Sequence, residues 1–377
     1  MAGPWPHRVW GGCAAIGYAT AALLGGRWAF PVAGLGAVAV PLGWLTVLGR
    51  GQLEVAVVER SGRLLLATGS PYPPDPGRLA DYTPYLPGMA VFGALPGDPR
   101  WWLGGVFVGS LWVVGRLGAP PPMRWLVICP PVALPLATGG VDLPLAGLMC
   151  LGLALAGRGR AVPAGLVLGL AATLKWTAWP ALPVAAALLA AREPLGRRAG
   201  PGSPVPSVPG RRSGPYAPGR RSALRCTGVA LATAAAGTLP ALLADPDAFR
   251  AHVVDFPLGL TTTASPAASP LPGPLLAAYA PGGTLLAAAL LTTAALLLAL
   301  SLVVRPPRTT AAAAARLALG LALATALMPA SRFGYLVHPL VLLATLWRPP
   351  CPASPSPWSS PMTSRPAKAA SRPSSSS

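Results

Sequence analysis

The stretch that decides the fold is residues 283–304, GTLLAAALLTTAALLLALSLVV, which runs for 22 residues without a charged side chain and stops at Arg305. A helix of about 20 apolar residues crosses the hydrocarbon core of a bilayer, so this stretch predicts a membrane-spanning helix. The rest of the chain repeats the pattern, because apolar blocks of roughly 14 to 22 residues alternate with short segments of Arg, Pro or Gly. The sequence therefore indicates a polytopic membrane protein.

The composition excludes an ordinary soluble domain. Of the 377 residues, 53% are hydrophobic and 10% are charged, and the mean hydropathy is +0.55. A soluble protein carries about 25% charged residues. The net charge of +19 does not indicate nucleic-acid binding, because that requires basic groups on one folded face and most of them here lie in connections between apolar blocks. We expect membrane lipids, and no nucleic acid, as partners.

The cysteines and histidines do not form a recognisable framework. The chain has no C-x-x-C pair, and its three histidines have no His or Cys partner at ligand spacing. The five cysteines are Cys13, Cys129, Cys150, Cys226 and Cys351. We therefore expect no disulfide framework, no metal site and no cofactor.

The apolar blocks predict an all-α transmembrane bundle of about eleven spans within residues 1–348. The first block runs directly into the second, so it is expected to remain as an anchor. Two segments without apolar content are expected to be disordered on the cytoplasmic side, a basic loop at 192–222 and a tail at 349–377. The predicted spans are 9–26, 29–48, 100–117, 124–140, 143–157, 162–174, 178–191, 224–245, 283–304, 310–330 and 334–348.

The basic residues predict the orientation, because Lys and Arg in short connections are retained on the cytoplasmic side. The connection 192–225 holds eight arginines and is therefore placed inside. Threading the chain outward from it makes 49–99, 138–142, 245–282 and 331–333 external. Nine of the ten carboxylates then lie outside, where chemistry can use them; the alternative is that they only solubilise the loops.

The blocks 162–174 and 178–191 are shorter than a straight span requires. This part of the chain either crosses twice as short tilted helices or forms a re-entrant hairpin, and Lys175 lies at its tip in both cases. A lysine in an apolar run costs about 2.5 to 3.5 kcal/mol, so an anionic partner such as a lipid phosphate is expected. The alternative is that Lys175 extends to the membrane interface between Trp176 and Trp179.

The first external loop, 49–99, is the longest polar segment between the early spans. Glu54, Val57, Val58, Leu64 and Leu65 recur at roughly helical spacing, which predicts a short amphipathic helix with Glu54 where the second span leaves the membrane. Tyr72, Tyr82 and Tyr85 follow among several prolines. Their aromatic faces suit sugar rings, although tyrosines also gather in interfacial belts without a ligand.

Residues 139–183 contain G-x-x-D ending at Asp142, R-G-R at 158–160, and A-G-L-V-L-G-L-A-A-T-L-K ending at Lys175. This region resembles the centre of membrane mannosyltransferases of the glycosyltransferase-C type, in particular glycosyltransferase family 87. The long first external loop is similar as well, with Glu54 after the entering helix and G-S-P-Y ending at Tyr72. The chain departs from the family pattern in having Glu54 in place of Asp, and Val58 in place of Tyr.

The resemblance implies transfer of a hexose, mannose above all, from a polyprenyl-phosphate sugar to a lipid or glycan acceptor outside the cytoplasm, at the plasma membrane. Such a transfer needs a base for the acceptor hydroxyl, for which Glu54 is the first candidate, Asp81 the second and Asp142 the third. Lys175 and Arg332 are candidates to stabilise the phosphate leaving group, which makes a metal unnecessary.

The closing segment S-R-F-G-Y-L-V-H-P, residues 331–339, is also similar to the family and places His338 with Arg332. We expect His338 and the three loop tyrosines to contribute to substrate binding. Two other readings stay open. A secondary transporter would explain interrupted short segments, although no repeat relates the two halves of the chain. A non-catalytic membrane scaffold would tolerate replacement of the external carboxylates.

Overall fold

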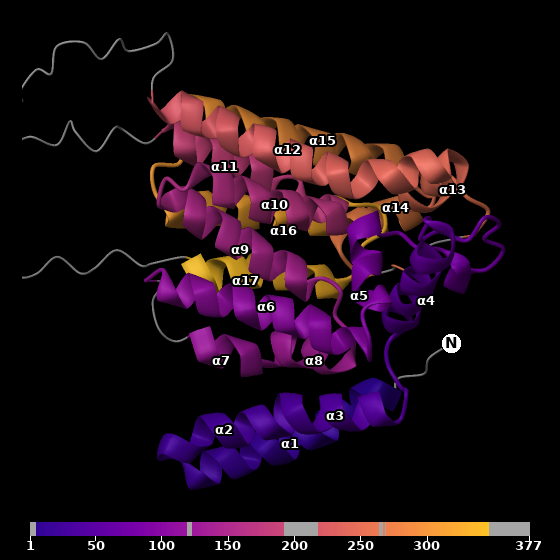
Figure 1. The fold of residues 1–377 in the computed structure, drawn as a ribbon, viewed down its shortest axis with the longest axis vertical. Helices are drawn as coiled ribbons and strands as arrows, with labels where there is room; N and C mark the ends of the chain where they lie inside the picture. The colour runs from indigo at the N-terminus through magenta and orange to yellow at the C-terminus, as the bar shows by residue number, and fades with distance from the viewer. Residues whose placement is uncertain (1–4, 119–122, 192–217, 264–266, 268, 347–377) are drawn as a thin grey trace, which may run out of the picture. The chain divides into compact units, whose positions relative to one another are not determined.

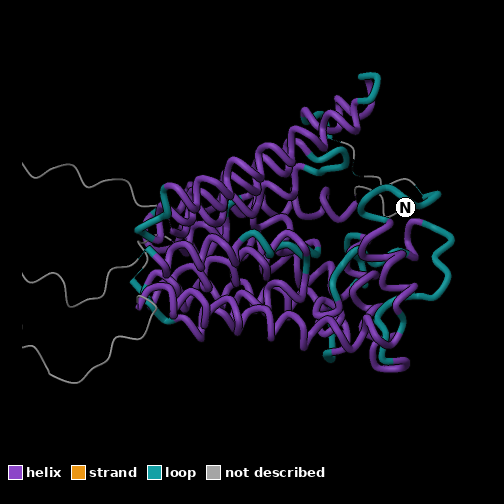
Figure 2. The backbone as a smooth tube through the Cα atoms, turned by 90° about the horizontal axis from the view of Figure 1, so that it is seen from above, coloured by secondary structure: helices purple, strands orange, loops and turns teal. Residues whose placement is uncertain are grey.

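The structure is a computed structural model, and it describes residues 5–118, 123–191, 218–263, 267 and 269–346. This part of the chain consists of helices joined by loops and turns, and it contains no strand (Figure 2). The prediction of an all-α protein is confirmed. The predicted tail 349–377 and residues 192–217 of the predicted disordered loop lie outside the described residues.

Several helices have the length and composition of membrane spans. Four are long and apolar enough to cross a bilayer: Gly26–Val47, Gly219–Ala244, Gly283–Val304 and Thr310–Leu327. Four shorter apolar helices accompany them: Leu143–Gly157, Ala161–Leu174, Trp176–Ala190 and Phe333–Leu346. These helices support a helical membrane protein, whereas the count of eleven spans remains a prediction.

The chain begins with a helical hairpin. Helix α1 (Trp5–Leu24) turns through η1 (Gly26–Trp28) into α2 (Ala29–Gly34), the π-helical turn η2 (Leu35–Ala39) and α3 (Val40–Val47). The two arms cross at glycines: a Cβ added to Gly17 would lie 2.6 Å from Cα of Gly36. Small residues at such a crossing allow the backbones to approach closely, as in membrane helix pairs.

The remaining long helices lie side by side (Figure 1). In chain order they are α6 (Pro99–Arg116), α7 (Met123–Ile128), α8 (Pro130–Thr138), α9 (Leu143–Gly157), α10 (Ala161–Leu174), α11 (Ala181–Ala190), α12 (Pro218–Ala244), α15 (Gly283–Val304), α16 (Thr310–Leu327) and α17 (Val337–Leu346). Most described residues of each predicted span are helical. Two details differ: the predicted span 124–140 is broken between α7 and α8, where Pro130 begins the second helix, and α12 begins at Pro218, six residues before the predicted 224.

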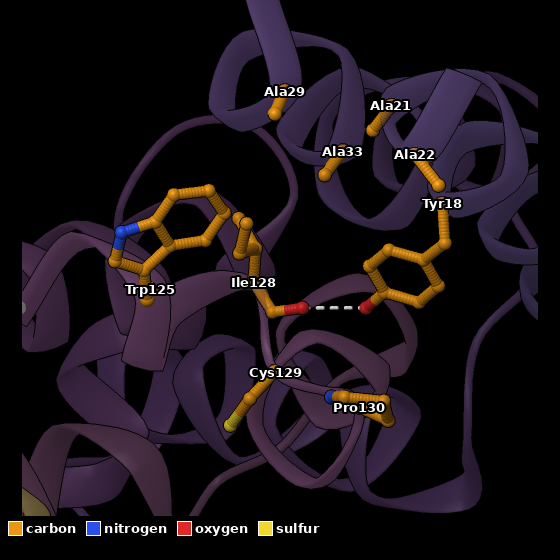
Figure 3. A pocket seen from close by; sticks show the side chains of 9 residues that line it. All are labelled: Tyr18, Ala21, Ala22, Ala29, Ala33, Trp125, Ile128, Cys129 and Pro130. Carbon is orange, nitrogen blue, oxygen red and sulfur yellow. Dashed lines mark hydrogen bonds between the residues drawn. The ribbon is translucent and has the colours of Figure 1, made fainter. Parts of the chain in front are cut away.

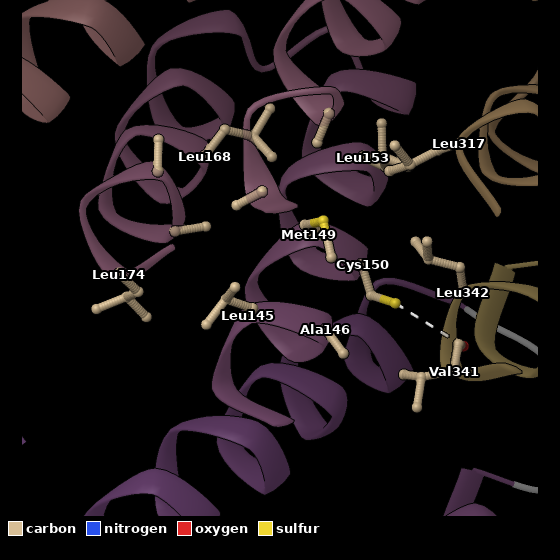
Figure 4. Packing of buried hydrophobic residues seen from close by; sticks show 14 of the residues in the cluster. Leu145, Ala146, Met149, Cys150, Leu153, Leu168, Leu174, Leu317, Val341 and Leu342 are labelled. Atoms are coloured by element: carbon tan, nitrogen blue, oxygen red, sulfur yellow. Dashed lines mark hydrogen bonds between the residues drawn. The ribbon is translucent and has the colours of Figure 1, made fainter. Parts of the chain in front are cut away.

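Helix α9 is the centre of the bundle. Twelve of its 15 residues are buried, and Met149, Cys150 and Leu153 pack among side chains of α10, α16 and α17 (Figure 4). Gly147 and Gly152 give the neighbouring helices room, because a Cβ on Gly152 would lie 2.5 Å from the Leu168 side chain. In contrast, α15 buries only Gly283 and Ala287, so its leucine-rich surface suits a lipid environment.

The two ends of the bundle differ in charge. One end, here called the basic end, carries the connections with Arg27, Arg116 to Arg124, Arg158 to Arg160 and Arg305 to Arg308; there the Arg158 guanidinium donates to the carbonyl of Leu117. The nine described carboxylates lie at the other end, here called the loop end. The nine carboxylates that the sequence grouped on one side are therefore grouped at one end of the fold.

The loop end is capped by α4 (Leu53–Thr68), η3 (Leu79–Asp81), η4 (Pro87–Met89) and α5 (Ala90–Ala94), and by α13 (Pro246–Arg250), η7 (Ala251–Asp255) and α14 (Pro272–Tyr279). The predicted helix over 54–65 is confirmed as α4, which buries Val57 and Val58 and leaves Leu66 exposed. The helices of the loop 245–282 were not predicted, because their apolar patterns are short and interrupted by proline. Helix α17 is directly preceded by η8 (Phe333–Leu336), which also lies at this end.

Candidate functional site

Two ion pairs meet at the loop end, formed by residues far apart in the sequence. Nη1 of Arg332 lies 2.7 Å from Oε1 of Glu54, across 278 residues of chain. Nζ of Lys175 lies 2.5 Å from Oδ1 of Asp142. Glu54 is in the first turn of α4, where the helix dipole favours an acidic side chain, and Asp142 directly precedes α9.

The two pairs differ in their access to solvent or ligand. The Lys175 and Asp142 side chains are 11% and 16% exposed, whereas those of Arg332 and Glu54 are 43% and 23% exposed. The Lys175 ammonium also lies over two aromatic rings, 5.3 Å from the centroid of Tyr85 and 5.1 Å from that of Tyr335. Attraction to two rings and a carboxylate fixes Lys175, so Arg332 is the cation that is free to change partners.

The non-helical backbone that follows α10 holds Lys175 in place. Helix α10 ends at Leu174, whose carbonyl accepts a hydrogen bond of 3.1 Å from the Leu86 amide of the loop 49–99. Gly88 of the same loop packs against Thr173, since a Cβ at Gly88 would lie 2.3 Å from Oγ1 of Thr173. The loop is thereby closed over the ion pairs, and it carries Tyr85 with it.

Tyr85 and His338 bring two further polar groups to the cluster. Burial, and then the charge of Glu54, raise the pKa of the Tyr85 hydroxyl well above its ordinary value, so the phenol stays protonated. The His338 side chain is 2% exposed, and its Nδ1 lies 3.0 Å from the carbonyl oxygen of Tyr335. Because a carbonyl only accepts, Nδ1 carries the proton and Nε2 has a free lone pair in the neutral ring.

Nε2 of His338 is buried 3.7 Å from Oδ1 of Asp142 and has no hydrogen-bond partner among the residues that the structure describes. A buried polar atom without a partner is costly, so an orphaned acceptor beside a carboxylate favours a donor from outside the chain. A ligand hydroxyl near both acceptors fits this arrangement. The cluster can thus bind an anion at Arg332 and a hydroxyl group at His338 and Asp142.

The structure brings together six of the nine residues that the sequence singled out: Glu54, Tyr85, Asp142, Lys175, Arg332 and His338. The anionic partner expected for Lys175 is Asp142. The catalytic and binding roles assigned to these residues remain predictions.

Tyr72 and Tyr82 lie in a neighbouring aromatic cluster around His252. The Tyr72 ring stacks on His252 with centroids 5.5 Å apart, and Tyr82 stacks on Phe256 at 4.2 Å. Tyr72, Tyr82 and Tyr85 are only 2%, 5% and 6% exposed. Their rings are therefore packed against protein instead of lying on an open face for a sugar, and the Tyr72 hydroxyl donates to the carbonyl of Tyr85 at 3.0 Å.

His252 connects the loops 49–99 and 245–282. Its Nδ1 accepts from the Thr83 amide at 3.0 Å, and its Nε2 donates to the Pro73 carbonyl at 2.8 Å. Burial lowers the pKa of His252, because the charged ring loses its hydration. Neutral His252 is also the form that the contact with Thr83 requires, since a protonated Nδ1 cannot accept.

Asp81 does not join the ion pairs. Its Oδ2 accepts from the backbone amide of Arg78 at 2.9 Å and lies 3.7 Å from Nε of Arg78. The guanidinium of Arg60 donates to the carbonyl oxygens of Ala80 and Asp81 on the other side of this turn. These contacts give Asp81 a local structural role.

Three contributors were missed from the sequence: Tyr335, Arg60 and His252. Tyr335 lies within the closing segment 331–339, and its position between Arg332 and His338 was an available signal. Arg60 and His252 had no such signal, because their partners are mainly backbone carbonyls and amides of distant loops. In the part of the chain that the structure describes, no group of three His, Cys, Asp or Glu side chains is arranged to hold a metal ion.

Comparison of the chain with protein-family models, curated proteins and solved structures finds no match. Interpretation of the site therefore rests on its own geometry.

Proposed function

We propose that the protein is a membrane glycosyltransferase with a glycosyltransferase-C-like bundle of about eleven spans. In this proposal it moves a hexose, mannose above all, from a polyprenyl-phosphate sugar to a lipid or glycan acceptor on the extracytoplasmic face of the plasma membrane. The observation that carries the proposal is the meeting of the Glu54–Arg332 and Asp142–Lys175 pairs at one end of a bundle of apolar helices. Carboxylates and cations at this place suit a substrate that arrives in the membrane.

The accessible pair supplies the reacting groups. The donor phosphate is an anion, and Arg332 offers a guanidinium that binds phosphate oxygens in a forked geometry. When Arg332 turns to the phosphate, Glu54 loses its ion-pair partner and its oxygens become free to accept a hydrogen bond. A carboxylate within hydrogen-bond reach of the acceptor hydroxyl can then remove its proton.

The transfer balances with these residues. The acceptor oxygen forms a bond to the anomeric carbon of the sugar and gives its proton to Glu54. The bond from that carbon to the phosphate oxygen breaks, and the polyprenyl phosphate leaves with the electron pair. Arg332 meets the new charge on the phosphate, and Lys175 adds to the positive field while Asp142 and the two tyrosine rings hold it.

The geometry favours Glu54 over the other two candidate bases. Asp142 is bound to Lys175 at 2.5 Å within a largely buried pair, so it is suited to holding Lys175 and a substrate hydroxyl. The Asp81 carboxylate stabilises its own turn by accepting the Arg78 amide. Among the three candidates, only Glu54 is both partly exposed and paired with a cation that a substrate phosphate can bind instead.

The test uses the purified protein in lipid nanodiscs with a radiolabelled polyprenyl-phosphate mannose and a membrane extract as the source of acceptor. The wild type is expected to transfer label to a product. Glu54→Gln is expected to lower the rate about 100-fold or more, the range for loss of a general base. Arg332→Gln is expected to raise KM for the donor, because the phosphate loses its ligand.

Two matched controls accompany these variants. Glu59→Gln removes a carboxylate from another face of α4, and Asp81→Asn removes the turn carboxylate; both are expected to retain activity. If Glu54→Gln transfers sugar as fast as the wild type while Asp81→Asn does not, the assignment of the base is wrong.

A transporter is the second candidate, and the break between α10 and α11 at Lys175 is the observation in its favour. Vesicles loaded with the same donor discriminate the two. Movement of label across the vesicle membrane without a glycosylated product would favour transport over transfer.

A further inference from the structure

An apolar groove lies far from the ion pairs, between the N-terminal hairpin and the α7–α8 segment (Figure 3). Its volume is about 400 Å³. Alanines of α1 and α2, among them Ala22, Ala29 and Ala33, form one wall, and Trp125 and Ile128 form the other. The groove exists because α1 and η2 cross tightly at glycines, and α1 and α2 then present mainly alanine methyl groups to the large side chains opposite.

The lining of the groove is apolar and offers a ligand almost no hydrogen-bonding groups. The Tyr18 hydroxyl at its edge already donates to the carbonyl of Ile128 at 2.5 Å. A volume of this size is typical of sites for small molecules or chain segments. An apolar chain is therefore the part of a ligand that fits here.

The surroundings place the groove in a membrane. Its α2 wall belongs to the helix Gly26–Val47, which is long and apolar enough to span a bilayer. On the rim, Leu23 is 88% exposed and Trp28 is 55% exposed. Exposed apolar groups beside an apolar groove are expected to contact lipid.

Two cations neighbour the groove in the chain, since Arg124 precedes the lining residue Trp125 and Arg27 lies two residues before the lining residue Ala29. The guanidinium of Arg124 lies 5.8 Å from the ring centroid of Trp125 on one wall and 5.6 Å from that of Phe30 on α2. The guanidinium of Arg27 lies 5.3 Å above Trp28 in the η1 turn. Within the described residues neither guanidinium forms an ion pair, and the described carboxylates lie at the opposite end of the bundle.

The Phe30 and Trp125 rings join the two sides at this point. Their centroids lie 5.5 Å apart with the planes at 80°, so they form an edge-to-face contact between α2 and α7. Arg124 covers both rings, and its N–H groups remain available to a ligand beside the groove.

We propose that this groove binds an anionic glycerophospholipid, with an acyl chain between the alanine wall and Trp125 and with its phosphate on Arg124 and Arg27. A guanidinium group binds phosphate through two parallel hydrogen bonds. Anionic lipids concentrate at membrane surfaces that face basic protein segments. The lipid fills the apolar gap and neutralises cations that have no ion-pair partner among the described residues. This site is independent of the glycosyl-transfer proposal.

Native mass spectrometry of the full chain in detergent tests the site by titration with phosphatidylglycerol or phosphatidylcholine. The wild type is expected to bind one phosphatidylglycerol at least tenfold more tightly than phosphatidylcholine. Arg124→Gln is expected to remove this preference. Ala22→Leu, which fills the groove from its exposed side, is expected to weaken phosphatidylglycerol binding at least tenfold.

Matched controls separate the site from general charge or bulk effects. Arg116→Gln removes a guanidinium that lies 5.4 Å over Trp112 at the same end of the bundle but away from the groove. Ala289→Leu adds the same bulk on exposed α15. Both controls are expected to bind phosphatidylglycerol as the wild type does.

Each contrary outcome overturns the proposal. Equal binding of the two lipids by the wild type would remove the anionic preference, and unchanged binding by Arg124→Gln or Ala22→Leu would place the lipid elsewhere. Competition by sn-glycerol 3-phosphate at the concentration of the whole lipid would show that the chain is not held in the groove. A wild-type dimer that Ala22→Leu dissociates, without a change in lipid binding, would assign the groove to a second copy.

Discussion

Replacement of Lys175 by Met tests whether the buried ion pair holds the loop end together. The Lys175 and Asp142 side chains are only 11% and 16% exposed, so the variant leaves a carboxylate in a poorly hydrated place without its cation. Loss of one partner of a buried pair costs about 3 to 5 kcal/mol. Lys175→Met is therefore expected to lower the free energy of unfolding by about 3 kcal/mol or more.

The double variant Lys175→Met with Asp142→Asn is expected to recover most of this loss, because a pair without charge has no stranded carboxylate. The exposed pair of Arg78 and Asp81 provides the control. Its Arg78 side chain is 88% exposed, so Arg78→Met is expected to cost less than about 1 kcal/mol. Unfolding is measured by titration with sodium dodecyl sulfate in mixed micelles, followed by tryptophan fluorescence and circular dichroism. If Lys175→Met costs no more than Arg78→Met, or if the double variant loses the sum of the single losses, the pair does not stabilise this end.

Three further predictions concern the loop end and the topology. Because burial lowers the pKa of His252, the unfolded chain takes up a proton at a higher pH than the folded chain does. The free energy of unfolding is therefore expected to fall as the pH drops below about 6.5, and His252→Gln is expected to reduce this dependence in titrations at pH 7.5 and 5.5. A Cβ on Gly62 would lie 2.0 Å from the backbone of α5, so Gly62→Ala is expected to cost about 1 to 3 kcal/mol, whereas Gly105→Ala, with open space around it, is expected to cost nothing; equal melting curves would contradict this. Reporter fusions after residues 75 and 210 are expected to lie on opposite sides of the membrane, and activity of both on one side would refute the orientation.

The helices were predictable because their signal is local. An apolar block such as 283–304 specifies a helix wherever it lies, and its predicted limits coincide with α15. The end of α10 at Leu174 was also readable, since Lys175 interrupts the apolar pattern. The break between α7 and α8 was missed because Pro130 lies in a run that remains apolar on both sides.

The residues of the site were predictable, but which of them form ion pairs was not. Glu54 and Arg332 were each chosen for their position after a span or before one, yet nothing in 278 residues of intervening chain specifies that they touch. The burial of Tyr72, Tyr82 and Tyr85 was likewise hidden, because an aromatic residue in a loop suits both an open binding face and a packed interior. Pairing and burial depend on how the loops close over the bundle, which a linear pattern does not encode.

The short length of α9 and α10 sets these helices apart from α15. With 15 and 14 residues, they rise about 22 Å, whereas the 22 residues of α15 rise about 33 Å, a little more than the hydrocarbon core of about 30 Å. Asp142 directly precedes α9 and Lys175 directly follows α10, and their side chains are only 16% and 11% exposed. Bulk water is kept at a distance there, so each charge acts more strongly than it would on a surface. A ligand that reaches this pair has to leave part of its hydration behind.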